Sequence, residues 1–307
     1  MPLPGVVMSG RNTLYRYLRR FLRFPRIFPV EYNPPTKEVL EREILYDLTR
    51  ENPGNCLFGR YDEQKVLAIA EKTGLLRGLA RLGYNDPILS LSCSDPSEQR
   101  ICMYAGEKTR GRLLMELRLS LTNFQLMRKI GPFGKETCFR MLMLLWLVLS
   151  DPDRDFSLER PRLPGQNRPG LGLLNEVFFL LRTFARELSV DGMLDTPENF
   201  HTALFYSRIF RYLDPEVEGR FLAIARDLKG VPLALASDAI RRNCLFDRST
   251  GELLPWQASE QVMTERGLLR RFFNSKEYRE AREEARSKIR AIVNWDLYRD
   301  KLAADGR

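Results

Sequence analysis

The amino-acid sequence predicts a mixed α/β protein of the α+β class, in which a sheet is flanked by helices. Of the 307 residues, 44% are hydrophobic and 29% are charged, which is typical of a globular chain and excludes a wholly disordered or fibrous one. Apolar residues recur at helical spacing near both ends of the chain. Between these ends, short segments alternate between apolar and polar residues, as strands do.

The length is that of two domains, or of one domain with an appended part. Composition divides the chain into four parts: a basic amphipathic arm (1–35), a helical region (36–85), a central α/β domain (86–230) and a helical C-terminal extension (231–307). The longest apolar run, 141–149, is far shorter than the ~20 residues that span a bilayer.

Positive charge is concentrated at the start of the chain. Residues 1–30 carry six arginines and no acid, so they account for six of the nine net positive charges. The remainder is nearly balanced and shows no basic stripe interleaved with aromatic residues, so we expect no specific nucleic-acid partner. We expect a cytoplasmic protein, although an acid-free start rich in arginine also resembles an organelle transit peptide.

Residues 13–24 form the amphipathic part of the arm. Leu14, Tyr17, Leu18 and Phe21 share one helix face, and arginines occupy most of the other. Such a helix either makes peripheral contact with an anionic membrane through residues 11–26, or packs on the protein with its arginines in solvent.

Two further helices are predicted before the central domain. A helix spans 36–50, and a helical stretch spans 62–82, where Gly74 and Gly78 weaken the helix and favour a break.

Strands are predicted at 88–93, 101–105 and 113–121. The glycine-bounded turn at 106–111 joins the last two as a hairpin. Residues 136–149 are apolar nearly all round and too long for a typical strand, so we expect a buried helix there. The proline-rich segment 151–169 is predicted to be a loop.

A further pattern of helices follows this loop. We expect a long helix that begins near Gly170, a short strand at 189–196 and a helix from Thr196-Pro197-Glu198 to about Arg211. Another helix is expected at 216–228, and the tail at 259–302 reads as helical with interleaved charges.

The segment 165–172 (GQNRPGLG) has the features of a phosphate site. Backbone N–H groups in the first turn of a helix lack intrahelical partners and lie at the positive end of the helix dipole. Glycines let an anion approach that backbone, and Arg168 adds a positive charge.

A hairpin, a glycine-rich entry into a helix, a short strand and a helix with Asn199 and Tyr206 resemble the GNAT superfamily of N-acetyltransferases. Gly170-Leu171-Gly172 is similar to the second half of the family's [RQ]-x-x-G-x-[GA] motif, and Asn199 and Tyr206 match the ends of N-x-x-A-x-x-L-Y. Asn167 stands where the family has Arg or Gln, with Gln166 and Arg168 on either side. The resemblance covers about 88–213 and implies a GNAT-like mixed sheet.

The resemblance implies an acyl-CoA-dependent N-acyltransferase, with acetyl-CoA as co-substrate and a small-molecule or peptide amine as acceptor. Its cofactor-binding residues would be Gln166, Arg168, Gly170, Leu171, Gly172, Leu173 and Asn199. Tyr206 would protonate the departing thiolate, and Glu116 would accept a proton from the amine. The alternative is a non-catalytic binding protein on a degenerate GNAT scaffold, attached to an anionic membrane through residues 11–26.

No metal site is expected. The five cysteines are odd in number and contain no C-x-x-C pair, so we expect reduced thiols. His201 is the only histidine and cannot form a site of several histidines. It is either a structural residue or the base of a Ser–His or Cys–His pair.

Overall fold

A computed structural model describes residues 55–305 of the chain, apart from 127–128, 135 and 265–266. The expected basic arm (1–35) and the expected helix at 36–50 lie outside the described residues. No helix in the described ranges is both long and apolar enough to cross a membrane.

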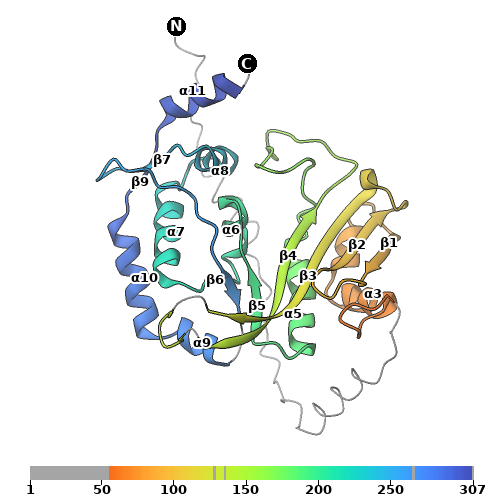
Figure 1. Ribbon diagram of the computed structural model, residues 1–307. Coiled ribbons are helices and arrows are strands. Elements are labelled where there is room, and N and C mark those ends of the chain that lie inside the picture. The colour runs from red at the N-terminus through yellow and green to blue at the C-terminus, as the bar shows by residue number, and fades with distance from the viewer. Residues whose placement is uncertain (1–54, 127–128, 135, 265–266, 306–307) are drawn as a thin grey trace.

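The protein is of the α+β class and is built on a mostly antiparallel seven-stranded sheet (Figure 1). The strand order is β1-β2-β3-β4-β5-β8-β6, and β4 and β5 form the parallel pair. The strands are β1 (Pro87–Ser92), β2 (Gln99–Ala105), β3 (Leu113–Gln125), β4 (Cys138–Leu149), β5 (Gly192–Asp195), β6 (Arg211–Tyr212) and β8 (Gln261–Met263). A separate two-stranded sheet pairs β7 (Leu245–Asp247) with β9 (Ala291–Val293).

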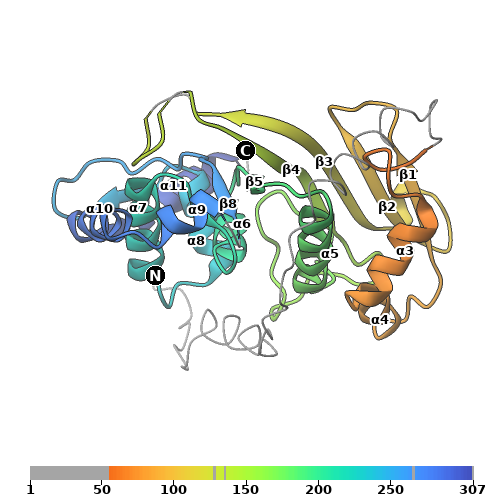
Figure 2. The same ribbon diagram turned by 90° about the horizontal axis from the view of Figure 1, so that it is seen from below.

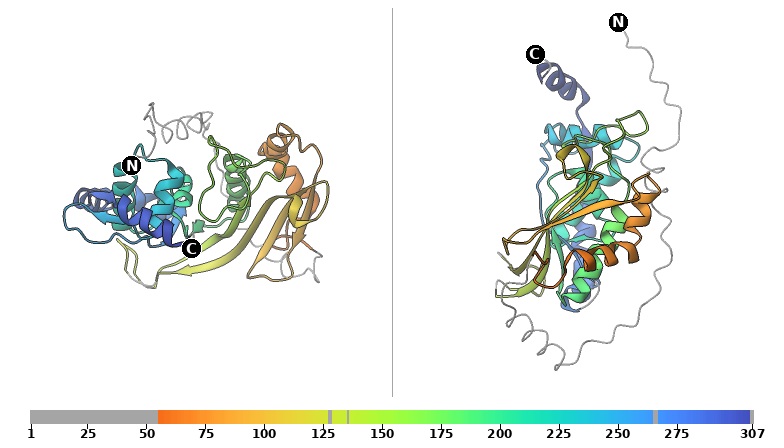
Figure 3. Two further views of the ribbon diagram at one scale, coloured as in Figure 1. Left: turned by 90° about the horizontal axis from the view of Figure 1, so that it is seen from above. Right: turned by 90° about the vertical axis from the view of Figure 1, so that its right-hand side faces the viewer.

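Helices α3 (Glu63–Lys72), α4 (Leu75–Ala80) and α5 (Leu174–Glu187) lie on one face of strands β1–β4 (Figures 2 and 3). The other α-helices lie on the β5–β8–β6 side of the molecule (Figure 1). They are α6 (Phe200–Tyr206), α7 (Pro215–Asp227), α8 (Leu233–Arg241), α9 (Gly267–Phe273), α10 (Lys276–Lys288) and α11 (Trp295–Asp305), and a short 3-10 helix, η1, spans Arg110–Arg112.

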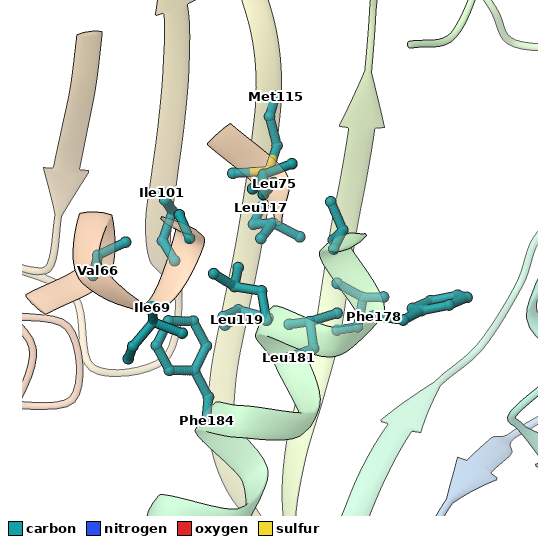
Figure 4. Packing of buried hydrophobic residues seen from close by; sticks show 14 of the residues in the cluster. Val66, Ile69, Leu75, Ile101, Met115, Leu117, Leu119, Phe178, Leu181 and Phe184 are labelled. Atoms are coloured by element: carbon teal, nitrogen blue, oxygen red, sulfur yellow. The ribbon is translucent and has the colours of Figure 1, made fainter. Parts of the chain in front are cut away.

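The main core lies between α3, α4, α5 and the sheet (Figure 4). Strand residues Ile101, Met115 and Leu117 are at most 1% exposed and face helix residues such as Phe184. Every second residue of these strands points to one side of the core, and one face of each helix forms the other side. The alternation and the helical spacing seen in the sequence therefore place apolar side chains in contact. Burial of this kind is worth roughly 1.5–3 kcal/mol for each large apolar side chain.

The sequence-based strands at 88–93, 101–105 and 113–121 are confirmed as the antiparallel β1, β2 and β3. The predicted break in the helical stretch 62–82 is also confirmed. Gly74 has φ +82° between α3 and α4, a backbone conformation that glycine adopts without steric cost.

The predicted buried helix at 136–149 is wrong, because this segment is strand β4. It pairs with β3 from Gln125↔Cys138 to Met115↔Leu149. From Met141 to Leu144 both faces of β4 are covered, since Met141 and Leu142 belong to different core clusters, whereas Cys138 and Arg140 are exposed. A strand packed on both faces is apolar without alternation, and periodicity alone does not distinguish it from a buried helix.

The expected start of the long helix at Gly170 is also wrong. Gly172 has φ +75°, outside the helical region, so α5 begins at Leu174 with Leu173 as its N-cap. Helix α6 is shorter than predicted: it begins at Phe200, because Asn199 has extended backbone angles, and ends at Tyr206.

The C-terminal segment 231–307 is not wholly helical. It contains α8, α9, α10 and α11, but it also supplies β8, which lies between β5 and β6 in the central sheet. Strands β7 and β9 come from the same segment. A three-residue strand carries too short a pattern to be recognised in sequence.

Candidate functional site

Strands β4 and β5 run side by side and then diverge. Their parallel pairing covers three residue pairs, the last being Met143↔Leu194. Strand β5 ends one residue later at Asp195, whereas β4 continues to Leu149 paired only with β3. Beyond Met143, β4 therefore presents backbone N–H and C=O groups that no described strand pairs with.

A β-bulge lies at this point of divergence. Arg118 pairs with Trp146 and Leu119 pairs with Leu144, so Leu145 is an extra residue on β4. Leu145 is 40% exposed and Trp146 is 47% exposed, in contrast to the buried Leu144. Bulges re-aim the backbone locally and are common next to binding sites.

The loop that leads from β4 to α5 is tied to the end of β4. The N–H of Asp151 donates to the carbonyl of Pro169 at 2.8 Å, and Arg168 Nη1 donates to the carbonyl of Pro152 at 2.5 Å. Asp151 is itself buried and accepts the hydroxyl of Tyr84 at 2.7 Å. The predicted phosphate segment therefore lies beside the C-terminal end of β4.

The glycines of this segment leave its backbone uncovered. A Cβ on Gly170 would meet only the Leu149 carbonyl, at an ordinary 3.6 Å, and a Cβ on Gly172 would meet nothing within 4 Å. Leu171 and Leu173, in contrast, are 4% and 6% exposed and belong to the main core. The two leucine side chains thus anchor the loop, and the glycines present its backbone.

The N-terminus of α5 has no side-chain cap, because Leu173 stands at the N-cap. Its first N–H groups are those that an anion or a capping side chain would satisfy. Glu176 lies in this first turn and forms a long ion pair with Arg81 at 3.9 Å.

Two other predicted cofactor residues, Gln166 and Asn199, lie away from the first turn of α5 in the sequence. Gln166 Oε1 accepts the N–H of Leu163 at 3.3 Å, which closes a turn within the loop. Asn199 is the N-cap of α6, but its side chain makes no capping hydrogen bond.

Tyr206 is at the end of α6 and is 5% exposed. Its ring packs against Phe178 with a centroid distance of 5.3 Å and stacks on Phe210 at 5.7 Å. Burial, and secondarily the charge of Asp195, raise the pKa of Tyr206 well above its usual value, so its hydroxyl keeps its proton at neutral pH.

Glu116 lies apart from Tyr206. Its neighbours on β3, Met115 and Leu117, point into the main core that contains Tyr206, so Glu116 points to the opposite face of the sheet. There its Oε1 pairs with Arg118 Nε at 2.8 Å and with Arg100 Nε at 3.5 Å. The structure does not bring these two predicted catalytic residues together.

A polar cluster that the sequence did not predict lies beneath α6 and consists of Asp195, Gln261, Tyr212 and Tyr206. Asp195 on β5 is opposite Gln261 on β8, and Gln261 is opposite Tyr212 on β6. Burial raises the pKa of Asp195 to about 7, and the backbone N–H of Thr196 acts in the other direction. The available signal was an acid at the end of a short apolar strand, but its partners come from separate segments of the chain.

His201 lies outside this cluster. Its Nδ1 is 2.7 Å from the hydroxyl oxygen of Ser237 on α8, and burial lowers the pKa of His201 to about 4. His201 and Ser237 are 6% and 1% exposed, so this pair is a closed contact between helices. All five cysteines are free thiols, and no group of His, Cys, Asp and Glu suited to a metal ion occurs among the described residues.

Comparison with known proteins does not assign the chain: no family model, no curated protein and no solved structure matches it.

Proposed function

We propose that this protein is an acyl-CoA-dependent N-acyltransferase of GNAT-like fold that transfers an acyl group, in the simplest case acetyl, to an amine. The observation that carries the proposal is the divergence of the parallel strands β4 and β5, with a bulge at Leu145 and the start of α5 beside it. Helix α5 connects β4 to the parallel β5, so a loop, a helix N-terminus and a free strand edge meet at one place.

The free edge of β4 suits an extended ligand that carries amide groups. Such a ligand pairs with the backbone of an uncovered strand as an added strand does. The pantetheine arm of CoA is extended and contains two amides. The bulge at Leu145 would supply a backbone N–H for the acyl carbonyl oxygen, where negative charge develops during acyl transfer.

The loop at 168–173 and the start of α5 would hold the pyrophosphate. Gly170 and Gly172 leave the backbone uncovered, and the uncapped first turn of α5 provides N–H donors at the positive end of the helix dipole. Arg168 is exposed and adds a positive charge while its Nη1 holds Pro152. Tyr206, protonated at neutral pH, would donate its proton to the leaving thiolate.

A non-catalytic binding protein on the same scaffold is the second candidate. The burial of Tyr206 and the ion pairs of Glu116 with Arg118 and Arg100 favour it, because a non-catalytic protein needs neither side chain to contact a substrate.

The first experiment is a thermal-shift titration of the full chain with acetyl-CoA and free CoA, with ATP and NAD as controls. A ligand at ~100 times its dissociation constant stabilises the native state by about 2.7 kcal/mol, which raises the melting temperature by several degrees. A saturable shift with CoA species alone is expected. No shift at millimolar CoA would reject the acyl-CoA proposal.

A matched pair of glycine variants locates the binding. Gly170→Ala has room for its Cβ but would shield the backbone from the pyrophosphate, so the CoA-induced shift should shrink. Gly111→Ala also has open space around its Cβ and lies in η1, so it should keep the wild-type shift. Release of free thiol from acetyl-CoA in the presence of amines then separates an enzyme from a non-catalytic CoA-binding protein.

A further inference from the structure

Three neighbouring strands place polar side chains in one row on the face of the sheet beneath α6. Met193 and Met263 point into the main core, so Asp195 and Gln261, each two residues away along its strand, share that face. Tyr212 is directly opposite Gln261 on the next strand. Side chains at opposite positions on neighbouring strands are close enough to share one ligand.

This row contains hydrogen-bonding atoms that the described residues do not satisfy. Asp195 Oδ2, Gln261 Oε1 and the hydroxyl oxygen of Tyr212 are buried and have no hydrogen-bond partner among those residues. Gln261 Nε2 donates to the Ala203 carbonyl at 3.4 Å, which directs the amide oxygen elsewhere. Gln261 also influences the pKa of Tyr212, but no hydrogen bond of ordinary geometry joins the two.

All three unsatisfied atoms are able to accept a hydrogen bond, and no cation in the described part of the chain compensates the carboxylate. The pKa of Asp195 is raised by burial and lowered by the backbone N–H of Thr196, and no Lys, Arg or His side chain among the described residues contributes to it. A buried carboxylate without a cation is costly, so such groups are retained where they serve a ligand or a reaction. The complementary ligand is a cation that donates several hydrogen bonds.

Asp195 is the partly exposed member of the row. Gln261 is 0% and Tyr212 is 1% exposed, whereas Asp195 is half-buried at the end of β5 with its Oδ2 buried. An amine therefore reaches these atoms only when the side chains that cover Asp195 Oδ2 move. Asp195 directly follows Leu194, the last residue paired with β4, so it lies where the two strands diverge and where the proposed acyl group would arrive.

We propose that Asp195 and Gln261 recognise the acceptor substrate as a primary ammonium group and that Asp195 then accepts its proton. This inference rests on the proposed acyl transfer. A primary ammonium has three N–H donors, which match Asp195 Oδ2, Gln261 Oε1 and the Tyr212 hydroxyl oxygen. A quaternary ammonium has none.

The reaction balances with these residues. One ammonium proton passes to the Asp195 carboxylate, and the neutral amine attacks the thioester carbonyl carbon. The new C–N bond forms as the C–S bond breaks, and the thiolate takes the proton of Tyr206. The second proton on nitrogen restores Tyr206, and Asp195 releases its proton to solvent, so the net products are an amide, CoA thiol and one proton.

The charges around Asp195 suit this role. Its pKa of about 7 allows it both to bind and to release a proton near neutral pH. Two tyrosines interact electrostatically with it, Tyr206 on α6 and Tyr212 on β6, and the pKa of each is raised by burial and by Asp195 itself. The same elements also carry His201, which contacts Ser237, and Arg211, which pairs with Glu218. Both tyrosines therefore remain neutral while Asp195 titrates.

The test measures thiol release from acetyl-CoA by the full chain with spermidine, phenethylamine and lysine amide, and with trimethylphenethylammonium as the matched quaternary compound. The three primary amines together should contain an acceptor, and the quaternary compound should give no turnover. Asp195→Asn should lower kcat/KM for the amine by about 100-fold or more, the usual range for loss of a general base. The thermal shift with acetyl-CoA should be unchanged.

Two further variants complete the design. Gln261→Met removes the amide but keeps the volume, and it should raise KM for the amine more than it lowers kcat. Asp296→Asn, at an exposed position of α11, is the same chemical change away from the site and should behave as the wild type.

The outcomes separate this inference from the proposed function. No thermal shift with CoA species in the wild type rejects the proposed function. A CoA shift without acetylation of any primary amine, or with equal turnover by the wild type and Asp195→Asn, overturns the assignment of Asp195 and leaves CoA binding intact.

Discussion

Replacing Asp195 by asparagine should make the protein more stable at alkaline pH. The substitution keeps the shape of the side chain and removes a charge that is buried without a cationic partner among the described residues. The introduced amide would also place an NH₂ donor beside the unsatisfied Gln261 Oε1, on the opposite strand position.

The magnitude follows from the pKa. Burial raises the pKa of Asp195 from 3.8 to about 7, and a tenfold change in proton affinity is worth about 1.4 kcal/mol, so ionised Asp195 costs about 4 kcal/mol of stability. Because the folded state holds this proton more tightly, the stability from protonated Asp195 is complete below pH ~4 and is lost as the pH rises through 7.

The assay is urea unfolding of the wild type and Asp195→Asn at several pH values from 4 to 8. Their difference in unfolding free energy should grow from near zero at pH 4 to about 4 kcal/mol at pH 8 in favour of the variant. Asp296→Asn controls for the general effect of removing an acid. A difference that is constant with pH, or a variant that is less stable at pH 8, would refute the reasoning.

Two other changes test helix–helix contacts in the described part of the chain. His201→Asn should remove an acid-sensitive part of the stability, because burial lowers the pKa of His201 to about 4 and the unfolded chain binds a proton near 6.5. Wild-type stability from this group is therefore lost as the pH falls from 6.5 to 4, by about 3 kcal/mol in all, and urea unfolding at pH 4.5 and 7.5 should show less loss in the variant. Gly219→Ala on α7 should lose about 1–3 kcal/mol despite the better helix propensity of alanine, because its Cβ would lie 2.2 Å from the Arg282 carbonyl oxygen on α10. Calorimetry with Gly111→Ala as the unhindered control measures this loss, and equal melting temperatures would show that α10 moves away without cost.

Sequence reasoning was correct for strands and helices that show a clear hydrophobic pattern and pair with a neighbouring segment of the chain. Strand β3 alternates along 113–121, and the turn at 106–111 sets its pairing with β2. The prediction of a helix at β4 was wrong because the strand is packed on both faces from Met141 to Leu144. That packing depends on α9 and α5, which come later in the chain.

The candidate site was predicted only in its local part. Gly170 and Gly172 were identified as a glycine-rich entry into a helix, and Tyr206 was implied by the resemblance to the GNAT superfamily. The structure places the loop beside the end of β4. Glu116 was chosen from its position in a hairpin, but strand alternation turns it to the face opposite Tyr206. The bulge at Leu145 depends on a register shift between two strands, for which no residue type is a signal.

By itself, the sequence determined the α+β class, the break at Gly74, the first three strands and the glycine-rich loop, because short-range periodicity and backbone preferences encode them. Only the tertiary structure decided that β4 is a strand, that β4 and β5 diverge and that Asp195, Gln261 and Tyr212 lie in one row. These three residues belong to three different strands, and the pairing of β8 between β5 and β6 brings them together. The raised pKa of Asp195 results from this pairing, because the pairing buries the carboxyl group. In an unfolded chain the same residue would be solvated and would ionise at its ordinary pKa.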